Sequence, residues 1–272
     1  MNKEVKNYPE LRAYLEGSNE SNITRKNLRR IFDEKLKDFP EDKLFSMLDV
    51  GSSDGEMSFP LAKTLRQEFN KFRYTAVEPE KPAFDRLNQI IREQNVGWAK
   101  TYNLTIEEYL KKVKGKKDLF DLILFAQSLY HMPKEEWDEI ISNSLRLLKP
   151  NGIIIIILDS HKGEAYRLKN LIMQGKADTL EFGDLYSAED LEDLLNKKGI
   201  EYLIEKFSIY MFVKRGKNKL FEFARHLAFL YRTFPERILS NNKDEVGQFL
   251  ESIQKDGEYI LENDVKVIIF RK

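Results

Sequence analysis

The chain of 272 residues contains no cysteine, which excludes disulfide bonds, thiolate metal sites and a cysteine nucleophile. It also carries no net charge, because 45 Lys and Arg residues are balanced by 45 Asp and Glu residues. Since phosphate binding is chiefly electrostatic, this balance argues against a nucleic-acid binder with a large basic surface. No apolar run approaches the roughly 18 residues of a membrane span. The charged N-terminal stretch has no apolar signal-peptide region, so we expect a soluble, cytoplasmic protein.

Signatures of several cofactor and metal chemistries are also missing. The three histidines, His131, His161 and His226, lie far apart and have no ligand spacing, so no metal site is predicted. The absence of a G-x-x-x-x-G-K-S/T motif disfavours a kinase or phosphohydrolase. The G-x-G-x-x-G fingerprint of hydride cofactors is absent as well.

From residue 44 onward, strand and helix patterns alternate. Strands are expected at 45–50, 74–77, 96–100, 120–125 and 153–158, and helices at 58–69, 83–94, 105–113 and 135–148. The run 153–158 is apolar on both faces, as a central parallel strand requires. Segments 201–213 and 259–270 are expected to form an antiparallel pair at the sheet edge. The pattern predicts a doubly wound, seven-stranded, Rossmann-like α/β sheet.

Two regions outside this sheet are expected to be helical. An amphipathic helix runs from about Ile23 to Leu36, where Pro40 stops the pattern. We expect residues 1–40 to form a helical substrate lid and residues 41–272 to form the main, cofactor-binding domain. A helical insertion at about 214–256 precedes the last strand.

The first two strands each end in a motif suited to a nucleoside. Strand 45–50 leads into D-x-G-x-S-x-G, formed by Asp49, Gly51, Ser53 and Gly55. Gly51 lets the backbone turn tightly beside a ligand, and Gly55 suits close packing of the next helix, whose N-terminal amides favour an anion. The second strand ends in Glu78-Pro79, where a carboxylate can accept both ribose hydroxyls.

These motifs, in this order, resemble those of class I S-adenosylmethionine-dependent methyltransferases, with Ser53 in place of the usual middle glycine. The resemblance implies S-adenosylmethionine as the cofactor and S-adenosylhomocysteine as the product. The predicted cofactor-binding residues are Asp49, Gly51, Ser53, Gly55, Glu78, Pro79, Ile106 and Ala126.

A third segment, Gln127-Ser128-Leu129-Tyr130-His131, follows the strand 120–125. Ligands of open α/β sheets bind outside the carboxyl ends of the strands, so Gln127 and Tyr130 are expected at the reaction site. Gln127 can orient the nucleophile, and His131 can take a proton because its free pKa is close to working pH. The predicted catalytic set is therefore Gln127, Tyr130 and His131, although an amine nucleophile can dispense with a base and His131 can be an ordinary loop residue.

This segment resembles the corresponding part of the histamine N-methyltransferase family, as do segments 14–20 and 260–263. In that family a glutamate of the first segment and an asparagine of the last contact the substrate. The resemblance thus implies Glu20, Gln127 and Asn263 as the substrate-binding set.

The chain departs from that family at several positions. His131 stands in place of a tyrosine, and Ala83 stands where the family has a glutamine. Judged without the resemblance, Glu20 is read as a solvated charge and Asn263 as a residue that caps or turns the start of a strand.

The leading hypothesis is N-methylation of a small amine or imidazole, an in-line displacement that depends on proximity and orientation. The alternatives are a methyltransferase of a protein side chain or tRNA, and a non-catalytic S-adenosylmethionine-binding protein. The balanced charge argues against RNA, and segment 126–129 lacks the Asn/Asp-Pro-Pro-aromatic motif of nucleic-acid amino methylation. The family resemblance suggests a monomer.

Overall fold

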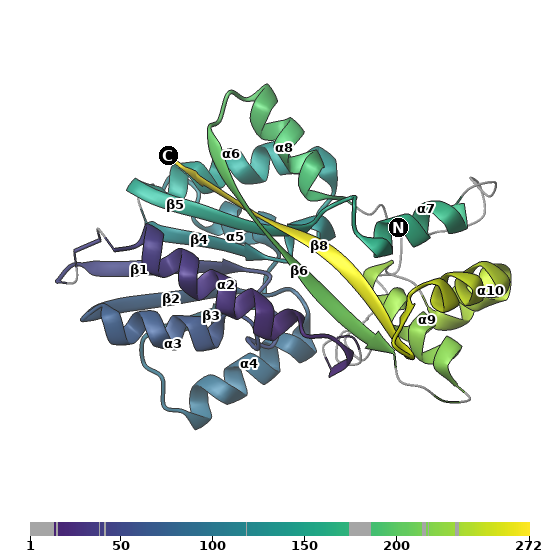
Figure 1. Cartoon of the computed structure of the whole chain (residues 1–272). Helices are drawn as coiled ribbons and strands as arrows, with labels where there is room; N and C mark the ends of the chain where they lie inside the picture. The colour runs from purple at the N-terminus through teal and green to yellow at the C-terminus, as the bar shows by residue number, and fades with distance from the viewer. Residues whose placement is uncertain are drawn as a thin grey trace. The chain divides into compact units, whose positions relative to one another are not determined.

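Parallel strands form the centre of the fold, as the apolar runs of the sequence predict. The computed structural model describes residues 14, 16–37, 39–40, 42–117, 119–173, 186–213, 216, 218–231 and 234–272. Within these residues the sheet has the order β3-β2-β1-β4-β5-β8-β6, with the short β7 beside β8 (Figure 1). The strands are β1 Leu44–Val50, β2 Lys71–Val77, β3 Ala99–Tyr102, β4 Phe120–Ala126, β5 Leu148–Asp159, β6 Tyr202–Val213, β7 Gln254–Lys255 and β8 Glu258–Arg271.

The first five strands pair in parallel, and β6 and β8 are neighbours that run in opposite directions (Figure 1). The helices are α2 Glu20–Lys35, α3 Phe59–Glu68, α4 Lys81–Glu93, α5 Ile106–Lys112, α6 Trp137–Leu147, α7 Glu164–Met173, α8 Ala188–Lys197, α9 Lys219–Leu230 and α10 Pro235–Ser252. The predicted doubly wound, Rossmann-like α/β class is confirmed.

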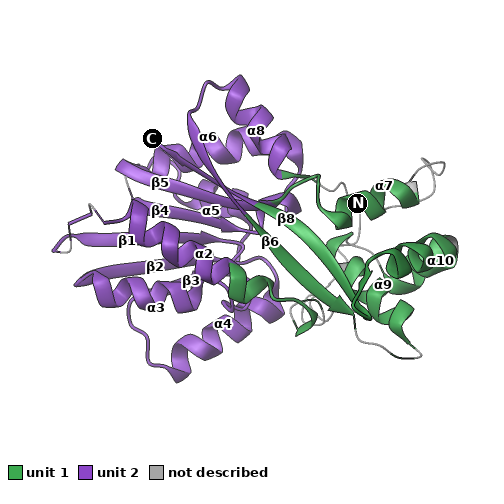
Figure 2. Cartoon of the chain, viewed as in Figure 1, with its two compact units in different colours: residues 1–23, 159–187, 207–265 green, residues 24–158, 188–206, 266–272 purple. Residues whose placement is uncertain are grey.

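The chain divides into two compact units (Figure 2). Unit 1 comprises Met1–Ile23, Asp159–Ser187 and Phe207–Val265, and unit 2 comprises Thr24–Leu158, Ala188–Lys206 and Lys266–Lys272. The start of the predicted N-terminal lid, residues 1–13 and 15, lies outside the described residues. No helix in the described ranges is long and apolar enough to cross a membrane.

The core of unit 2 lies on the central strands. Every side chain from Ile153 to Leu158 is fully buried, and so are those from Leu122 to Phe125 in the neighbouring strand β4. Burial of this apolar surface, at about 25 cal/mol per Å², is the main stabilising term of such a sheet. The continuous apolar run 153–158, in which polar and apolar residues do not alternate, therefore correctly predicted a strand that is covered on both faces.

Unit 1 has a core of its own around α7, α9 and α10. Leu168 of α7 and Phe223 and Leu227 of α9 are fully buried in it. The ring of Phe223 stacks on that of Phe249 with centroids 6.4 Å apart. The hydroxyl of Tyr231 donates a hydrogen bond of 2.8 Å to the carbonyl of Ala165. The predicted helical insertion thus consists of two helices, α9 and α10, with α7 packed into the same core.

The starts of β3 and β5 differ from the prediction for local reasons. Strand β3 begins at Ala99, not at Val96, because the Val96 N–H donates to the Ile91 carbonyl at the end of α4. Strand β5 begins at Leu148, and the turn of Pro150-Asn151-Gly152 lies within it, with Asn151 at φ +65°. Hydrogen bonds at the helix end, and a register shift against β4, move these boundaries.

A capping box fixes the start of α5, where the sequence predicts a helix from residue 105. The Glu108 N–H donates to Thr105 Oγ1 at 3.3 Å, and the Thr105 N–H donates to Glu108 Oε2 at 2.9 Å. We expect Thr105→Ala to lower the free energy of unfolding by about 1 kcal/mol. The substitution removes the hydroxyl that accepts the Glu108 N–H, and with it one half of the reciprocal pair of hydrogen bonds. Thr105→Ser keeps the hydroxyl and is the matched control. Urea unfolding curves measure the difference, and equal midpoints for the two variants would contradict the role of the cap.

Candidate active site

The turn after β1 packs closely against Ser128, which follows the end of β4. Gly51 has a φ of +68°, and a Cβ placed on it would lie 2.5 Å from Cβ of Ser128. Ser128 is held there because its hydroxyl donates to the Val50 carbonyl at 2.6 Å. The N–H of Gly51 donates to the Val77 carbonyl of β2 at 2.8 Å. Gly51 is therefore required both by its backbone conformation and by the approach of Ser128.

Ser53 continues this turn with a left-handed backbone, at φ +51°. A residue with a Cβ pays about 1–2 kcal/mol in this region, which explains why a glycine is usual at the position. The Ser53 N–H donates to Oε2 of Glu78 at 2.7 Å. The hydroxyls of Ser52 and Ser53 are buried and have no hydrogen-bond partner among the described residues.

Glu78 lies at the carboxyl end of β2 and is only 6% exposed. Its Oε1 accepts the Glu80 N–H at 2.8 Å, so both carboxylate oxygens receive a backbone donor. Burial raises the pKa of Glu78 to about 7, although the two donors favour the charged form. Each carboxylate oxygen has lone pairs for a second donor, which fits a pair of ribose hydroxyls.

Asn103 was not predicted, and it holds the Glu78-Pro79 turn in place. Its side-chain amide donates to the carbonyls of Glu78 and Pro79, each at 2.8 Å. A polar residue directly after β3 is the sequence signal that points to it, because the carboxyl ends of parallel strands share one edge of the sheet.

Asp49 is fully buried between β1, β2 and the start of α3. Its Oδ2 accepts the Tyr74 hydroxyl at 2.6 Å and also the Ser58 hydroxyl. Its Oδ1 has no hydrogen-bond partner among the described residues, and burial raises the pKa of Asp49 to about 6. Tyr74 and Ser58, which sequence reasoning did not single out, make Asp49 a connection between the two strands and α3.

The other predicted cofactor residues lie on neighbouring elements of unit 2. Gly55 has a φ of +79°, and a Cβ on it would lie 2.6 Å from Cδ1 of Leu87 in α4. Ile106 is buried at the start of α5, Ala126 is half-buried at the end of β4, and Pro79 is exposed. The nearest contact of Gly55 is thus with α4, whereas the sequence predicts close packing against the next helix, α3, whose Phe59 Cβ would lie 3.2 Å from the added Cβ.

The predicted catalytic residues follow β4. Gln127 has a left-handed backbone with φ +53°, and its N–H donates to the Ile157 carbonyl at 3.1 Å. A short 3-10 turn, Leu129–His131, comes next, in which the rings of Tyr130 and His131 lie 4.2 Å apart. Non-glycine residues rarely adopt this backbone region, and such strain concentrates at functional sites. His131 is exposed and Tyr130 is half-buried.

The remaining predicted substrate residues, Glu20 and Asn263, belong to unit 1. Glu20 starts α2 and is 5% exposed, so its reading as a solvated charge is wrong. Asn263 is 2% exposed, and its Oδ1 accepts the Ala165 N–H at 3.0 Å, which caps α7. Gln127 belongs to unit 2, so the convergence of the three side chains stays a prediction.

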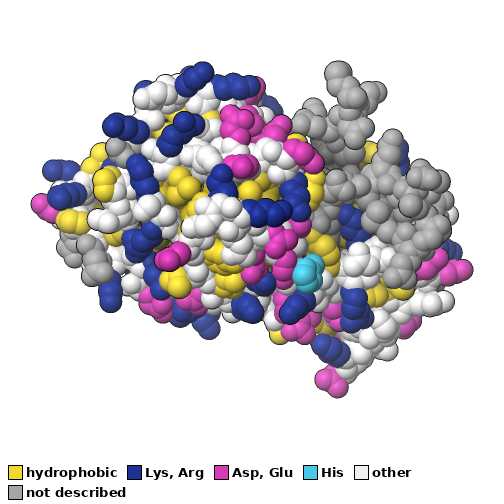
Figure 3. All heavy atoms as spheres, turned by 90° about the horizontal axis from the view of Figure 1, so that it is seen from above, with side chains coloured by type: hydrophobic (Ala, Val, Ile, Leu, Met, Phe, Trp, Pro, Cys, Tyr) yellow, Lys and Arg dark blue, Asp and Glu magenta, His cyan; other side chains and the backbone are white. Residues whose placement is uncertain are grey.

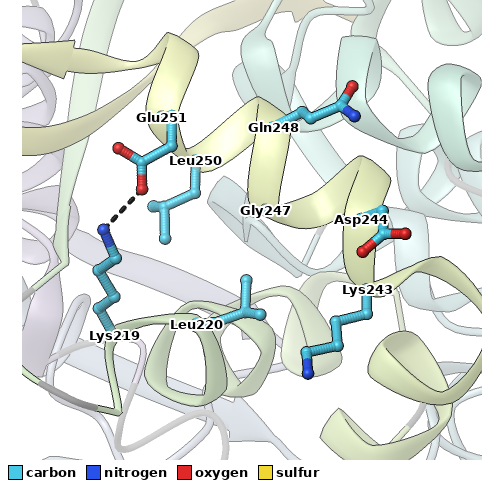
Figure 4. A pocket seen from close by; sticks show the side chains of 8 residues that line it. All are labelled: Lys219, Leu220, Lys243, Asp244, Gly247, Gln248, Leu250 and Glu251. Carbon is cyan, nitrogen blue, oxygen red and sulfur yellow. Dashed lines mark hydrogen bonds and ion pairs between the residues drawn. The ribbon is translucent and has the colours of Figure 1, made fainter.

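A surface depression of about 450 Å³ lies between α9 and α10 (Figure 4). One edge of it is formed by the ion pair of Lys219 with Glu251, at 2.6 Å. The lining residues are Lys219, Leu220, Lys243, Asp244, Gly247, Gln248, Leu250 and Glu251. None of them belongs to the predicted site. In the described parts of the chain, no group of three or more His, Asp or Glu residues could hold a metal ion.

A glycine turn after β1 and a buried carboxylate after β2, on a parallel α/β sheet, define a class of proteins that bind a nucleoside cofactor. A family model described as "Methyltransferase domain" matches residues 17–205. The chain belongs to this methyltransferase domain family, which confirms the predicted enzyme class. No curated protein sequence matches the chain significantly.

Solved structures share the fold at low sequence identity. The BH2331 protein of Bacillus halodurans is 12% identical, with a TM-score of 0.56 over 91% of this chain and 99% of that one. A SAM-dependent methyltransferase of Archaeoglobus fulgidus is 15% identical, with a TM-score of 0.52 over 93% and 94%. Phosphoethanolamine N-methyltransferase 2 of Haemonchus contortus, solved with S-adenosylhomocysteine, is 17% identical, with a TM-score of 0.51 over 89% and 52%. That ligand is the product that the resemblance to class I S-adenosylmethionine-dependent methyltransferases implies.

The contact between Gly51 and Ser128 leads to a direct test. We expect Gly51→Ala to lower the free energy of unfolding by about 2 kcal/mol or more, because a Cβ is strained at this φ and overlaps Ser128. Gly97→Ala is the matched control, since nothing lies within 4 Å of its Cβ position. Thermal and urea unfolding measure both variants. A Gly51→Ala protein as stable as the control would refute the close approach.

Proposed function

We propose that the chain transfers a methyl group from S-adenosylmethionine to a nitrogen of a small amine or imidazole. Membership of the methyltransferase domain family supports the methyl transfer. The observation that carries the amine is Glu20, a carboxylate only 5% exposed at the start of α2. A cationic ligand stabilises a carboxylate that is so far removed from water.

The residues at the ends of β1 and β2 fit the cofactor. Glu78 would accept the ribose hydroxyls, because each of its oxygens has accepting capacity left beside one backbone donor. The buried hydroxyls of Ser52 and Ser53, which lack partners in the described chain, would bond polar groups of the same ligand. When bound, S-adenosylmethionine supplies an electrophilic methyl group on a sulfonium. Gly51 would leave its backbone accessible to this ligand.

Gln127 would orient the acceptor nitrogen by a hydrogen bond, since it lies where β4 ends and its backbone is fixed by the Ile157 carbonyl. In-line displacement requires alignment more than acid–base chemistry, so positioning is the main contribution expected from this side chain. His131 is exposed and can pass a proton to water after transfer. Tyr130, beside His131, would line the acceptor site.

A macromolecular acceptor has less support. On the face seen in Figure 3, the described Lys and Arg side chains are spread among uncharged groups, and Asp and Glu lie on the same face, without a continuous basic surface. This agrees with the balance of 45 basic and 45 acidic residues. Phosphate binding needs an excess of positive charge, so the distribution favours a small acceptor over tRNA. The finer resemblance to the histamine N-methyltransferase family, and a monomeric state, stay predictions.

The raised pKa of Glu78 predicts how cofactor binding depends on pH. Ribose hydroxyls donate to the ionised carboxylate, and burial sets its pKa to about 7 in the ligand-free protein. Lowering the pH protonates Glu78 and must weaken binding, so affinity falls below pH 7 and is about tenfold lower at pH 6 than at pH 8. Isothermal titration calorimetry with S-adenosylhomocysteine measures this dependence.

The same titration tests Glu78→Gln. This variant should bind about 10- to 100-fold more weakly at pH 8 and lose the pH dependence, because it loses charge-assisted bonds of about 1.5–3 kcal/mol. Glu80→Gln is the matched control, since Glu80 contacts the Glu78 carboxylate through its backbone. Wild-type affinity in Glu78→Gln would remove this residue from the cofactor site.

The acceptor is tested by mass spectrometry with S-adenosylmethionine and a panel of small amines and imidazoles that includes histamine. We expect a product heavier by one methyl group. Glu20→Ala and Gln127→Ala should each lower kcat/KM by about 100-fold, which corresponds to the loss of a charged or orienting hydrogen bond. Glu236→Gln, an exposed carboxylate of unit 1, is the control. Cofactor binding without any product would contradict the amine and turn the search to protein or tRNA acceptors, or to a non-catalytic role.

A further inference from the structure

The segment that leads into Glu20 is attached to strand β6 within unit 1. Ser18 forms an antiparallel bridge with Met211. The Asn19 N–H donates to the Tyr210 carbonyl at 3.0 Å, and the Tyr210 N–H donates back to Asn19 Oδ1 at 2.8 Å. These bonds hold the backbone immediately before Glu20 at the edge of β6.

His226 of α9 lies directly against this segment. A Cβ placed on Gly17 would overlap Cε1 of the imidazole and lie 3.0 Å from its Nε2. The φ of Gly17 is not in the left-handed region, so the glycine is required by the approach of the ring and not by its backbone conformation. The ring of Tyr14 meets the imidazole of His226 edge-on, with ring centroids 6.5 Å apart. Tyr14 and His226 are both buried, at 2% and 6% exposure.

The imidazole is neutral in this position, because burial lowers the pKa of His226 to about 4. Its Nδ1 has no hydrogen-bond partner among the described residues. An apolar ring of similar size would fill the space without this cost, so packing alone does not account for a histidine here. The protonation state of a histidine at this position depends on whether the segment covers it. When the segment moves away, the imidazole is exposed to water, and its pKa rises so that it can bind a proton.

We propose that His226 is a positioning residue: its contact with Gly17 holds residues 16–20 in place within unit 1 and thereby positions the Glu20 carboxylate for the acceptor. The inference rests on the proposed role of Glu20 as the amine anchor. His226 touches Gly17 and Tyr14, and its effect on the acceptor runs through the backbone bonds of Ser18 and Asn19.

Amide hydrogen exchange tests the contact between Gly17 and His226 without reference to activity. Gly17→Ala should raise the exchange rates of the Asn19 and Tyr210 amides by about tenfold or more, because the added methyl group lifts the segment from His226. Gly247→Ala, where nothing lies within 4 Å of the Cβ position, is the matched control. His226→Ala removes the ring against which Gly17 packs and should raise the same two exchange rates. Unchanged exchange in Gly17→Ala or in His226→Ala overturns the proposal.

The pH dependence gives a second readout. Undocked His226 should titrate near its ordinary pKa of 6.5, and docked His226 titrates at about 4. Protons therefore favour the undocked state, and docking should weaken by about 20-fold between pH 7 and pH 5. The ionisable groups that face the imidazole are Tyr14 of the segment and Glu222 and Arg225 of α9. His226→Phe should abolish this dependence after correction for intrinsic exchange, and persistence of the dependence in His226→Phe contradicts the role of the imidazole.

Steady-state kinetics distinguish a misplaced acceptor-binding residue from a general loss of structure. With an amine that the wild type methylates, Gly17→Ala should raise KM for the amine about tenfold and leave the S-adenosylmethionine affinity unchanged. A loss in kcat alone, or weaker cofactor binding, overturns the positioning role. If the wild type methylates no amine, the proposed function fails, whereas the exchange data still decide whether His226 seats the segment.

Discussion

The hydrogen bond from the Ser53 N–H to the Glu78 carboxylate is the contact on which the candidate cofactor site depends. It exists because β1 and β2 pair in register from Leu44 and Lys71 to Val50 and Val77, so that both strands end at the same level. The turn after β1 and the carboxylate after β2 then share one edge of the sheet. Burial opposes ionisation of Glu78 and backbone donors favour it, which leaves its pKa in the range where a ligand can shift it.

The two kinds of candidate residue belong to different units. Those proposed for the cofactor lie in unit 2, on the strand ends of the parallel sheet, whereas Glu20, Asn263 and His226 lie in unit 1. A shared fold sets the cofactor chemistry, and residues attached to it set the acceptor. The family membership accordingly establishes methyl transfer, and the role of Glu20 in binding the acceptor stays a proposal.

Three positions have a small side chain or a left-handed backbone for different physical reasons. Gly51 is confined by Ser128, which approaches from the end of β4, as well as by its own φ of +68°. Ser53 takes a similar backbone with a Cβ and keeps its N–H on Glu78. Gly17 has no special φ and owes its identity to His226 alone. Only the first of these glycines belongs to a motif that the sequence displays.

Local pattern was sufficient for the alternation of strands and helices, the buried run Ile153–Leu158 and the helix that begins after Thr105, because periodicity and capping depend on neighbours within a few residues. The Gly-turn and Glu78 were predicted from motifs for the same reason. Sequence patterns did not predict three other features: the hydrogen bonds of Tyr74 and Ser58 to Asp49, the contact of Gly17 with His226, and the start of β3. Long-range packing and hydrogen bonds decide these features. Residues 17 and 226 meet only after the chain has folded, and no spacing in the sequence records such a contact.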